Sequence, residues 1–131
     1  MDASSLEVCF PGADVDMRWW NGFYHEEKGA ELSWRWCSDH GVLAFLNRSG
    51  RPIIGRLFMI LGGSENEVTV DDGQHEENIR VHQEGTPYSR VMRLEPGLAC
   101  LHFAAHGSKV PAPADPRVMY FYVREFSFQE E

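Results

Sequence analysis

The chain has 131 residues, 43% of them hydrophobic, and a formal net charge of −8 from 12 basic and 20 acidic side chains. This length suits one domain with a core of its own, and we expect a single domain over residues 1–131. The excess of acid opposes binding to a phosphate backbone, and no basic run offsets it. The composition therefore argues against a nucleic-acid partner.

The apolar runs predict neither a membrane span nor an export signal. The longest, Leu57–Leu61, is far shorter than the ~20 residues of a membrane-spanning helix, and the first residues lack the basic and apolar regions of a signal peptide. Cys9, Cys37 and Cys100 form no Cys-x-x-Cys pair and leave one thiol over in any pairing. We therefore expect a cytoplasmic protein whose cysteines act as small apolar side chains.

The first part of the chain alternates between short strands and turns. Leu6–Phe10 alternates apolar and polar residues up to a Pro-Gly pair, which predicts a first strand. Asp14–Asn21 is interpreted as a loop with at most a short strand, and Asn21-Gly22 as a turn whose glycine tolerates a positive φ. Ala30–Cys37 and Val42–Leu46 predict two neighbouring strands joined by a short loop.

The middle of the chain predicts a long strand and then a hairpin. Ile53–Leu61 is apolar on both alternating faces apart from two residues, which is typical of a central strand in a sandwich. Glu67–Asp71 and Asn78–His82 both alternate, and their valine and isoleucine residues would share an inward face. They predict an antiparallel hairpin with a loop longer than two residues.

The last third of the chain predicts three more strands. Tyr88–Leu94 and Leu98–Ala105 flank a Pro-Gly turn, and the loop His106–Pro116 contains three prolines, which block strand pairing. Arg117–Phe128 is the most aromatic segment and predicts the final strand. Eight or nine strands at turn spacings of roughly 8 to 12 residues indicate an all-β fold, an antiparallel β-sandwich that is jelly-roll-like.

Two tryptophans share one face of their expected strand. Side chains alternate across a strand, so Trp34 and Trp36 point to one side and Arg35, between them, points to the other. Such a pair of indoles either belongs to the core, where large aromatic side chains on strands usually lie, or forms a platform for a flat ligand. The sequence leaves both interpretations open.

Sugar binding requires aromatic rings beside polar groups that form directional hydrogen bonds. The candidate ligand-binding residues combine these two properties and are Tyr24, Glu27, Trp34, Trp36 and Arg117. Glu27 also has a structural interpretation, an ion pair with Arg35 or Arg117 that ties a loop to the sheet. Either arginine suits this role, because a planar guanidinium can hold a carboxylate through two parallel bonds.

A second pair of tryptophans suggests a different function. Trp19 and Trp20 are consecutive and face opposite sides of an extended segment, so we expect one of them to be exposed or at an interface. The alternative function is therefore a protein–protein interaction or scaffold domain, including a homo-oligomer, that binds no small ligand. In that case both tryptophans and the apolar face of the last strand would contact another chain.

The sequence shows no constellation typical of an enzyme or a metal site. The six histidines include no His-x-His pair, and no serine lies in a Gly-x-Ser-x-Gly motif. One group of potential metal ligands falls in the expected hairpin turn, where charge is typical of a solvated loop; it comprises Asp71, Asp72, His75, Glu76, Glu77 and His82. We therefore expect no catalysis, no cofactor and no bound metal.

Several short motifs, taken together, resemble a known class of module. They are Gly22-Phe23-Tyr24-x-x-Glu27, Trp34-x-Trp36, Val110-Pro111-Ala112 and Asp115-x-Arg117. The set is similar to small β-sandwich modules attached to bacterial glycosyltransferases and to other proteins of surface-polysaccharide biosynthesis, and it spans about Gly22 to Phe128. The resemblance implies a jelly-roll-like sandwich with a non-catalytic role beside glycan metabolism. The implied partner is a glycan or a carbohydrate-active protein. The resemblance also places Glu27 and Arg117 at motif positions, so we predict that the Arg117 guanidinium holds the Glu27 carboxylate through two parallel bonds.

Overall fold

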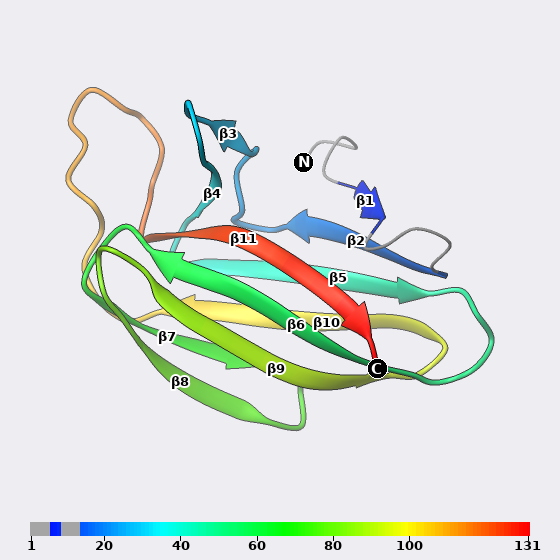
Figure 1. Cartoon of the computed structure of the whole chain (residues 1–131). Helices are drawn as coiled ribbons and strands as arrows, with labels where there is room; N and C mark the ends of the chain where they lie inside the picture. Colours follow the sequence, from blue (N-terminus) through cyan, green and yellow to red (C-terminus); the bar gives the residue numbers. More distant parts are fainter. Residues whose placement is uncertain (1–5, 9–13) are drawn as a thin grey trace.

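The computed structural model describes residues 6–8 and 14–131, which form two antiparallel sheets facing each other (Figure 1). The six-stranded sheet runs in the order β1 (Leu6–Val8), β2 (Val15–Trp20), β5 (His40–Asn47), β10 (Gly97–Ala105), β7 (Asn66–Asp71), β8 (Glu76–Val81). The five-stranded sheet runs in the order β3 (Glu27–Lys28), β4 (Ser33–Cys37), β11 (Phe121–Glu130), β6 (Ile53–Gly62), β9 (Thr86–Leu94). The predicted all-β sandwich is confirmed, with eleven strands among the described residues where eight or nine were expected. The described part of the chain contains no helix that is long and apolar enough to cross a membrane.

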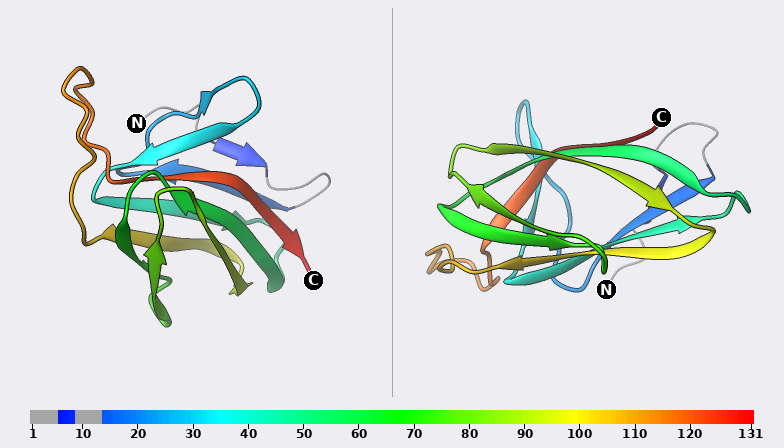
Figure 2. Two further views of the ribbon diagram at one scale, coloured as in Figure 1. Left: turned by 60° about the vertical axis from the view of Figure 1, so that its left-hand side comes forward. Right: turned by 90° about the horizontal axis from the view of Figure 1, so that it is seen from below.

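The core lies between the two layers, which are seen from below in the right-hand view of Figure 2. Every second residue of most strands points into it, and Phe45, Leu57, Leu101, Phe103 and Phe121 are fully buried there. This alternation is what the period of two in the sequence predicts, because successive side chains of a strand face opposite sides of the sheet.

Two strand predictions of the middle segment are confirmed in position. β6 lies between β11 and β9 in its sheet, as expected for Ile53–Leu61. β7 and β8 form the predicted hairpin, in which Val68 pairs with Ile79. The alternate face of β6 is partly exposed, however, and Ile54 on that face is 43% exposed. A central position in the sheet therefore does not place both faces of the strand in the core.

The structure corrects two expectations for the first half of the chain. The segment predicted as a loop with at most a short strand contains the six-residue strand β2, which pairs with both β1 and β5. β4 and β5 are not neighbours, because they belong to opposite sheets. The short link between them crosses the sandwich, and the Ser38 amide donates to the Gly22 carbonyl at 2.8 Å to anchor this crossing.

The last strand begins at Phe121 and not at Arg117, which lies in the preceding loop. This loop, residues 106–120, projects from one end of the sandwich and is drawn in orange in Figures 1 and 2. The Val110 amide donates to the Met119 carbonyl at 2.7 Å, which closes the loop on itself. The loop is therefore held together internally as well as by the contacts of Arg117 described below.

Two of the three cysteines can be placed, and both are free thiols. Cys37 is buried in the core, where burial raises the pKa of its thiol, and Cys100 is half-buried. Cys37 therefore acts as the small apolar side chain that was expected. Cys9 and the predicted turn after the first strand lie outside the described residues.

The two consecutive tryptophans face opposite sides of β2, as predicted. Trp19 is 3% exposed and belongs to the core, whereas Trp20 is 39% exposed on the outer face of the six-stranded sheet. The expectation that both contact another chain is wrong for Trp19. It is also wrong for the apolar residues of the last strand, since Phe121, Val123 and Phe128 face the core.

Candidate ligand-binding site

Aromatic side chains gather on the outer face of the five-stranded sheet. Directly paired residues of antiparallel strands project to the same side of a sheet. Trp36 pairs with Tyr122, and Trp34 pairs with Arg124 on one side and Glu27 on the other. These five side chains therefore share the outer face, and we call this surface the aromatic face.

Neither tryptophan of β4 belongs to the core. Trp34 and Trp36 are half-buried, and the inward positions of their strand hold Arg35 and Cys37. Arg35 is only 7% exposed; its guanidinium lies 5.3 Å from the centre of the Trp19 ring and donates to the Tyr24 carbonyl at 2.9 Å. Because these contacts satisfy a cation inside the sandwich, the more aromatic side of β4 faces outwards.

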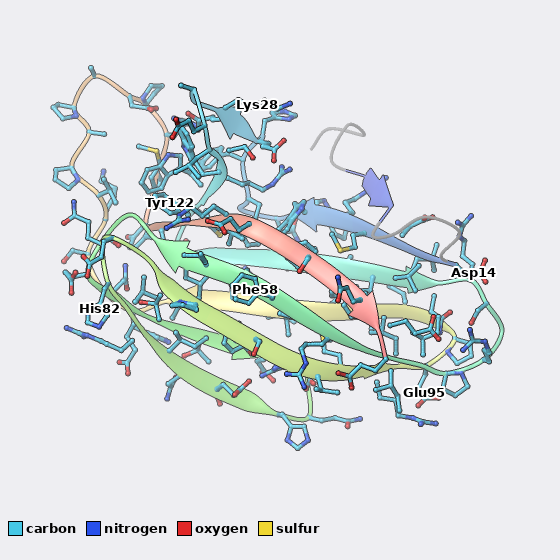
Figure 3. All side chains as sticks on the ribbon, in the orientation of Figure 1. Asp14, Lys28, Phe58, His82, Glu95 and Tyr122 are labelled. Carbon is cyan, nitrogen blue, oxygen red and sulfur yellow. The ribbon has the colours of Figure 1, made fainter. Side chains whose placement is uncertain are left out.

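The rings of Trp36 and Tyr122 pack edge to face above a glycine. Their centroids are 5.2 Å apart at an interplanar angle of 73°. A Cβ atom on Gly63, whose φ is +93°, would come within 2.8 Å of the Trp36 ring and 2.9 Å of the Tyr122 ring. The missing side chain thus lets both rings lie against the backbone at the end of β6. Figure 3 shows Tyr122 at the start of β11.

Tyr24 extends the aromatic face towards the 106–120 loop. Phe23 is buried and forms a bridge with Cys37, so the next side chain along the chain points outwards. The Tyr24 amide donates to the Trp36 carbonyl at 2.9 Å, which fixes the two residues side by side. The Tyr24 hydroxyl accepts from the Val118 amide at 3.1 Å and donates to the Val118 carbonyl at 3.2 Å. Tyr24 therefore joins the sheet to the loop.

Arg117 connects the sheet and the 106–120 loop through ion pairs. Its Nη1 lies 2.5 Å from Glu27 Oε2, which confirms the predicted pair, and its guanidinium lies 5.6 Å from the centre of the Tyr24 ring. Arg117 makes the two parallel hydrogen bonds predicted for Glu27 with Asp115 instead. Its Nε donates at 3.1 Å and its Nη2 at 2.7 Å. Hydrogen bonds from Arg117 lower the pKa of Asp115 to about 2, so the Asp115 carboxylate stays ionised at neutral pH.

The Glu27–Arg117 pair predicts a measurable coupling. The two side chains are 34% and 30% exposed, and pairs with such access to water contribute up to about 1 kcal/mol. We expect Glu27→Ala and Arg117→Ala to lower the free energy of unfolding by amounts that sum to about 1 kcal/mol more than the loss of the double variant. Urea denaturation of the three variants measures this. Strictly additive losses would contradict the pairing.

A pocket of about 190 Å³ opens beside Trp34, where β11 departs from regular pairing. The register of β11 with β6 shifts between Arg124 and Ser127, and Glu125 has a φ of 55° in this bulge. The pocket is lined by residues of β2, β4 and the bulge, among them Trp19, Trp34, Arg35, Arg124 and Glu125. The edge of the aromatic face therefore borders a hollow that gives access to one side of Trp34.

No family model matches the sequence, and no curated protein matches it. A solved structure described as "CBM4 structure and function" has a TM-score of 0.47 and 6% identity, covering 92% of this chain and 90% of that chain. Another, "Structure of TmCBM61 in complex with beta-1,4-galactotriose at 1.4 A resolution", has a TM-score of 0.33 and 14% identity, covering 80% of this chain and 74% of that chain. Neither similarity carries a functional conclusion at these scores.

Two residues of the aromatic face were not nominated from the sequence. Tyr122 was visible as part of the aromatic last strand, and Arg124 follows it on the same face at the strand period of two. Arg124 donates to the Glu84 carbonyl at 3.3 Å and pairs with the Glu125 carboxylate. These contacts hold its guanidinium beside Trp34.

The acidic hairpin turn has structural roles. Asp72 accepts from the Gln74 and His75 amides at 2.8 and 2.7 Å and so closes the β7–β8 turn. Glu77 accepts from Arg90 Nε at 2.9 Å. In the described part of the chain, no three His, Cys, Asp or Glu side chains are grouped so that they could hold a metal ion.

Proposed function

We propose that the protein is a non-catalytic carbohydrate-recognition module that binds a glycan on the aromatic face. The supporting observation is that Tyr24, Trp36 and Tyr122 follow one another across neighbouring segments of the sheet, outside the core. A contiguous aromatic surface of this kind is typical of a binding site. Indole and phenol rings stack against the C–H faces of sugar rings, which makes a glycan the suitable ligand.

Polar groups that can form hydrogen bonds with sugar hydroxyls border the rings. Glu27, Arg117 and Arg124 all lie at the edge of the aromatic face, and each is held by an ion pair. Side chains that are already fixed lose little conformational entropy when a ligand binds, so they favour affinity and a defined orientation of the ligand. Carboxylates and guanidinium groups together can accept from and donate to hydroxyl groups.

We place this module beside polysaccharide or glycan metabolism in the cytoplasm, with a glycan or a carbohydrate-active protein as its partner. The resemblance of its motifs to modules of glycosyltransferases supports the setting, and the odd number of cysteines supports the compartment. The net charge of −8 favours a neutral glycan over a polyanionic one.

The test is calorimetric titration of the protein with a panel of soluble neutral oligosaccharides. We expect Trp36→Ala to weaken binding about five- to thirtyfold, because a ring contact contributes roughly 1 to 2 kcal/mol. Trp20→Ala is the matched control, since it removes the same side chain from the outer face of the opposite sheet and leaves the aromatic face intact. Equal affinity of Trp36→Ala and the unaltered protein, or no binding across the panel, would overturn the proposal.

A further inference from the structure

The outer face of the six-stranded sheet carries a second apolar surface. Leu98, Leu46 and Trp20 are 68%, 40% and 39% exposed, and they come from three neighbouring strands, β10, β5 and β2. Ala44 and Cys100 lie between them on the same face. Single exposed apolar side chains are normal, but a contiguous group on one sheet face indicates an interaction site. We call this surface the apolar face.

The strand register arranges the apolar face in two adjacent rows that run across the strands. In the first row Asp16 pairs with Leu46, which pairs with Leu98. In the second row Arg18 pairs with Ala44, which pairs with Cys100. Across β2, β5 and β10 the first row thus holds an acid and two large side chains, and the second a base and two small ones.

We propose that two copies of this chain pack their apolar faces together about a two-fold axis that runs across the strands between the two rows. This axis makes facing strands antiparallel and places the first row of each copy over the second row of the other. The leucines then lie over Ala44 and Cys100, so large side chains meet small ones, as close packing requires. The face is self-complementary, which an interface with two-fold symmetry needs.

Charge supports the same arrangement. The axis brings Asp16 of each copy opposite Arg18 of the other, which gives two symmetric ion pairs. The guanidinium of Arg18 belongs to this face, and no described residue pairs with it within its own chain. Asp16 keeps its own partner Arg48, whose Nη2 lies 3.2 Å from Asp16 Oδ1, and a carboxylate has room for a second cation.

The shape of the face fits a dimer. A hollow of about 290 Å³ is lined by Trp20, Leu46 and Leu98 together with Ala44, and it can receive a leucine of the second copy. The contact is made by the three strands β2, β5 and β10, because β7 pairs with β10 only from His102 onwards and lies outside the two rows.

The proposed dimer does not depend on the proposed function, and it leaves the aromatic face accessible to a ligand. The apolar face and the aromatic face belong to opposite sheets, so pairing of the first leaves the second open on both outer sides of the dimer. A dimer would therefore present two aromatic faces that point away from each other. Such a dimer would hold two glycan chains together, one on each outer side.

The first test is the oligomeric state measured by sedimentation equilibrium of the full chain. We expect a dimer at micromolar concentration, and we expect Leu98→Glu to weaken association at least tenfold, because it places a carboxylate in the apolar contact. Val91→Glu is the matched control; Val91 is 48% exposed on β9 of the other sheet. A monomeric unaltered protein, or a Leu98→Glu variant that dimerises as well as Val91→Glu, would overturn the proposal.

A charge exchange tests the orientation of the two copies. Arg18→Asp should weaken dimerisation, because it sets two acids opposite each other across the axis. Adding Asp16→Arg in the same chain reverses both charges and should restore the dimer. Recovery in the double variant supports the antiparallel two-fold arrangement. Failure of the second exchange to restore association, with both variants folded by circular dichroism, would mean that Asp16 and Arg18 do not face each other.

Discussion

Gly22→Ala is expected to lower the free energy of unfolding by more than about 3 kcal/mol, a large part of the ~5 to 15 kcal/mol of a typical domain. Gly22 has a φ of 132°, and a Cβ atom there would lie 1.7 Å from the His40 carbonyl oxygen and 2.7 Å from Ser38 Oγ. The carbonyl belongs to the β5 backbone and cannot rotate away as a side chain can. Urea or thermal denaturation followed by circular dichroism measures the loss.

A matched variant separates the steric clash from backbone strain. Gly73 also has a positive φ, 95°, but an added Cβ there meets nothing within 4 Å. Gly73→Ala should cost only the conformational strain of an alanine at positive φ, about 1 to 2 kcal/mol. If the two variants lose equal stability, then the close approach of Gly22 to His40 does not constrain the fold.

The position of Gly22 connects this prediction to the candidate site. The residues after it leave the six-stranded sheet and enter the other one, where Phe23 is buried and Tyr24 faces outwards. The Phe23 ring packs against Trp19, Phe103 and Phe121 at centroid distances of 4.9, 5.3 and 6.2 Å. The crossing at Gly22 thus fixes the position of Tyr24 on the aromatic face.

Strand alternation predicted that Trp34 and Trp36 share a face, but it could not say which face is outside. The usual rule places the aromatic side of a strand inside and the arginine outside. Here Arg35 is inside because Trp19 and the Tyr24 carbonyl surround its guanidinium, and both partners are distant in the sequence. The decision depends on tertiary contacts, which the local pattern does not contain.

The residues that sequence reasoning missed depend on long-range register. Tyr122 enters the site because it pairs with Trp36, and no local signal fixes the pairing of strands so far apart in the chain. The incorrect prediction of a loop at β2 has a different cause. The β2 residues Val15, Met17 and Trp19 alternate with polar ones and all face the core, so the period of two was present in the sequence. The adjacent Asn21-Gly22 turn and the tryptophan pair led to the loop interpretation.

The sequence of the acidic hairpin predicts solvated charge, and the structure gives part of this charge a partner. Arg90 of β9 points inwards, with its side chain 6% exposed, and reaches across the open edge of the sandwich to β8. Its Nη2 lies 2.9 Å from Glu77 Oε1 and donates to the Val70 carbonyl at 3.1 Å. Its Nη1 lies 3.4 Å from Asp72 Oδ2. Because β8 and β9 belong to different sheets, Arg90 ties the two layers together.

Arg90→Ala should therefore lower the free energy of unfolding by about 3 kcal/mol, because it removes a buried cation and leaves carbonyl and carboxylate groups without their donor. This expected loss lies at the lower end of the range for breaking a buried ion pair, since Glu77 is 49% exposed and can be hydrated. Arg93→Ala is the matched control on the same strand. Arg93 is 59% exposed and pairs with an equally exposed Glu95, so its loss should stay below about 0.5 kcal/mol.

The unaltered protein and Arg90→Ala should differ in free energy of unfolding. The pH dependence of that difference identifies its electrostatic part. The hydrogen bond from the Tyr88 hydroxyl, and then the contacts with Arg90, lower the pKa of Glu77 below its ordinary value of 4.5. A carboxyl whose pKa is depressed in the folded state contributes stability above its unfolded pKa and loses that contribution as the pH falls. The gap between the unaltered protein and Arg90→Ala should thus narrow from pH 7 to about pH 3. If urea denaturation gives the same gap at both pH values, then Arg90 stabilises the sandwich through packing and carbonyl hydrogen bonds, and its charge adds nothing.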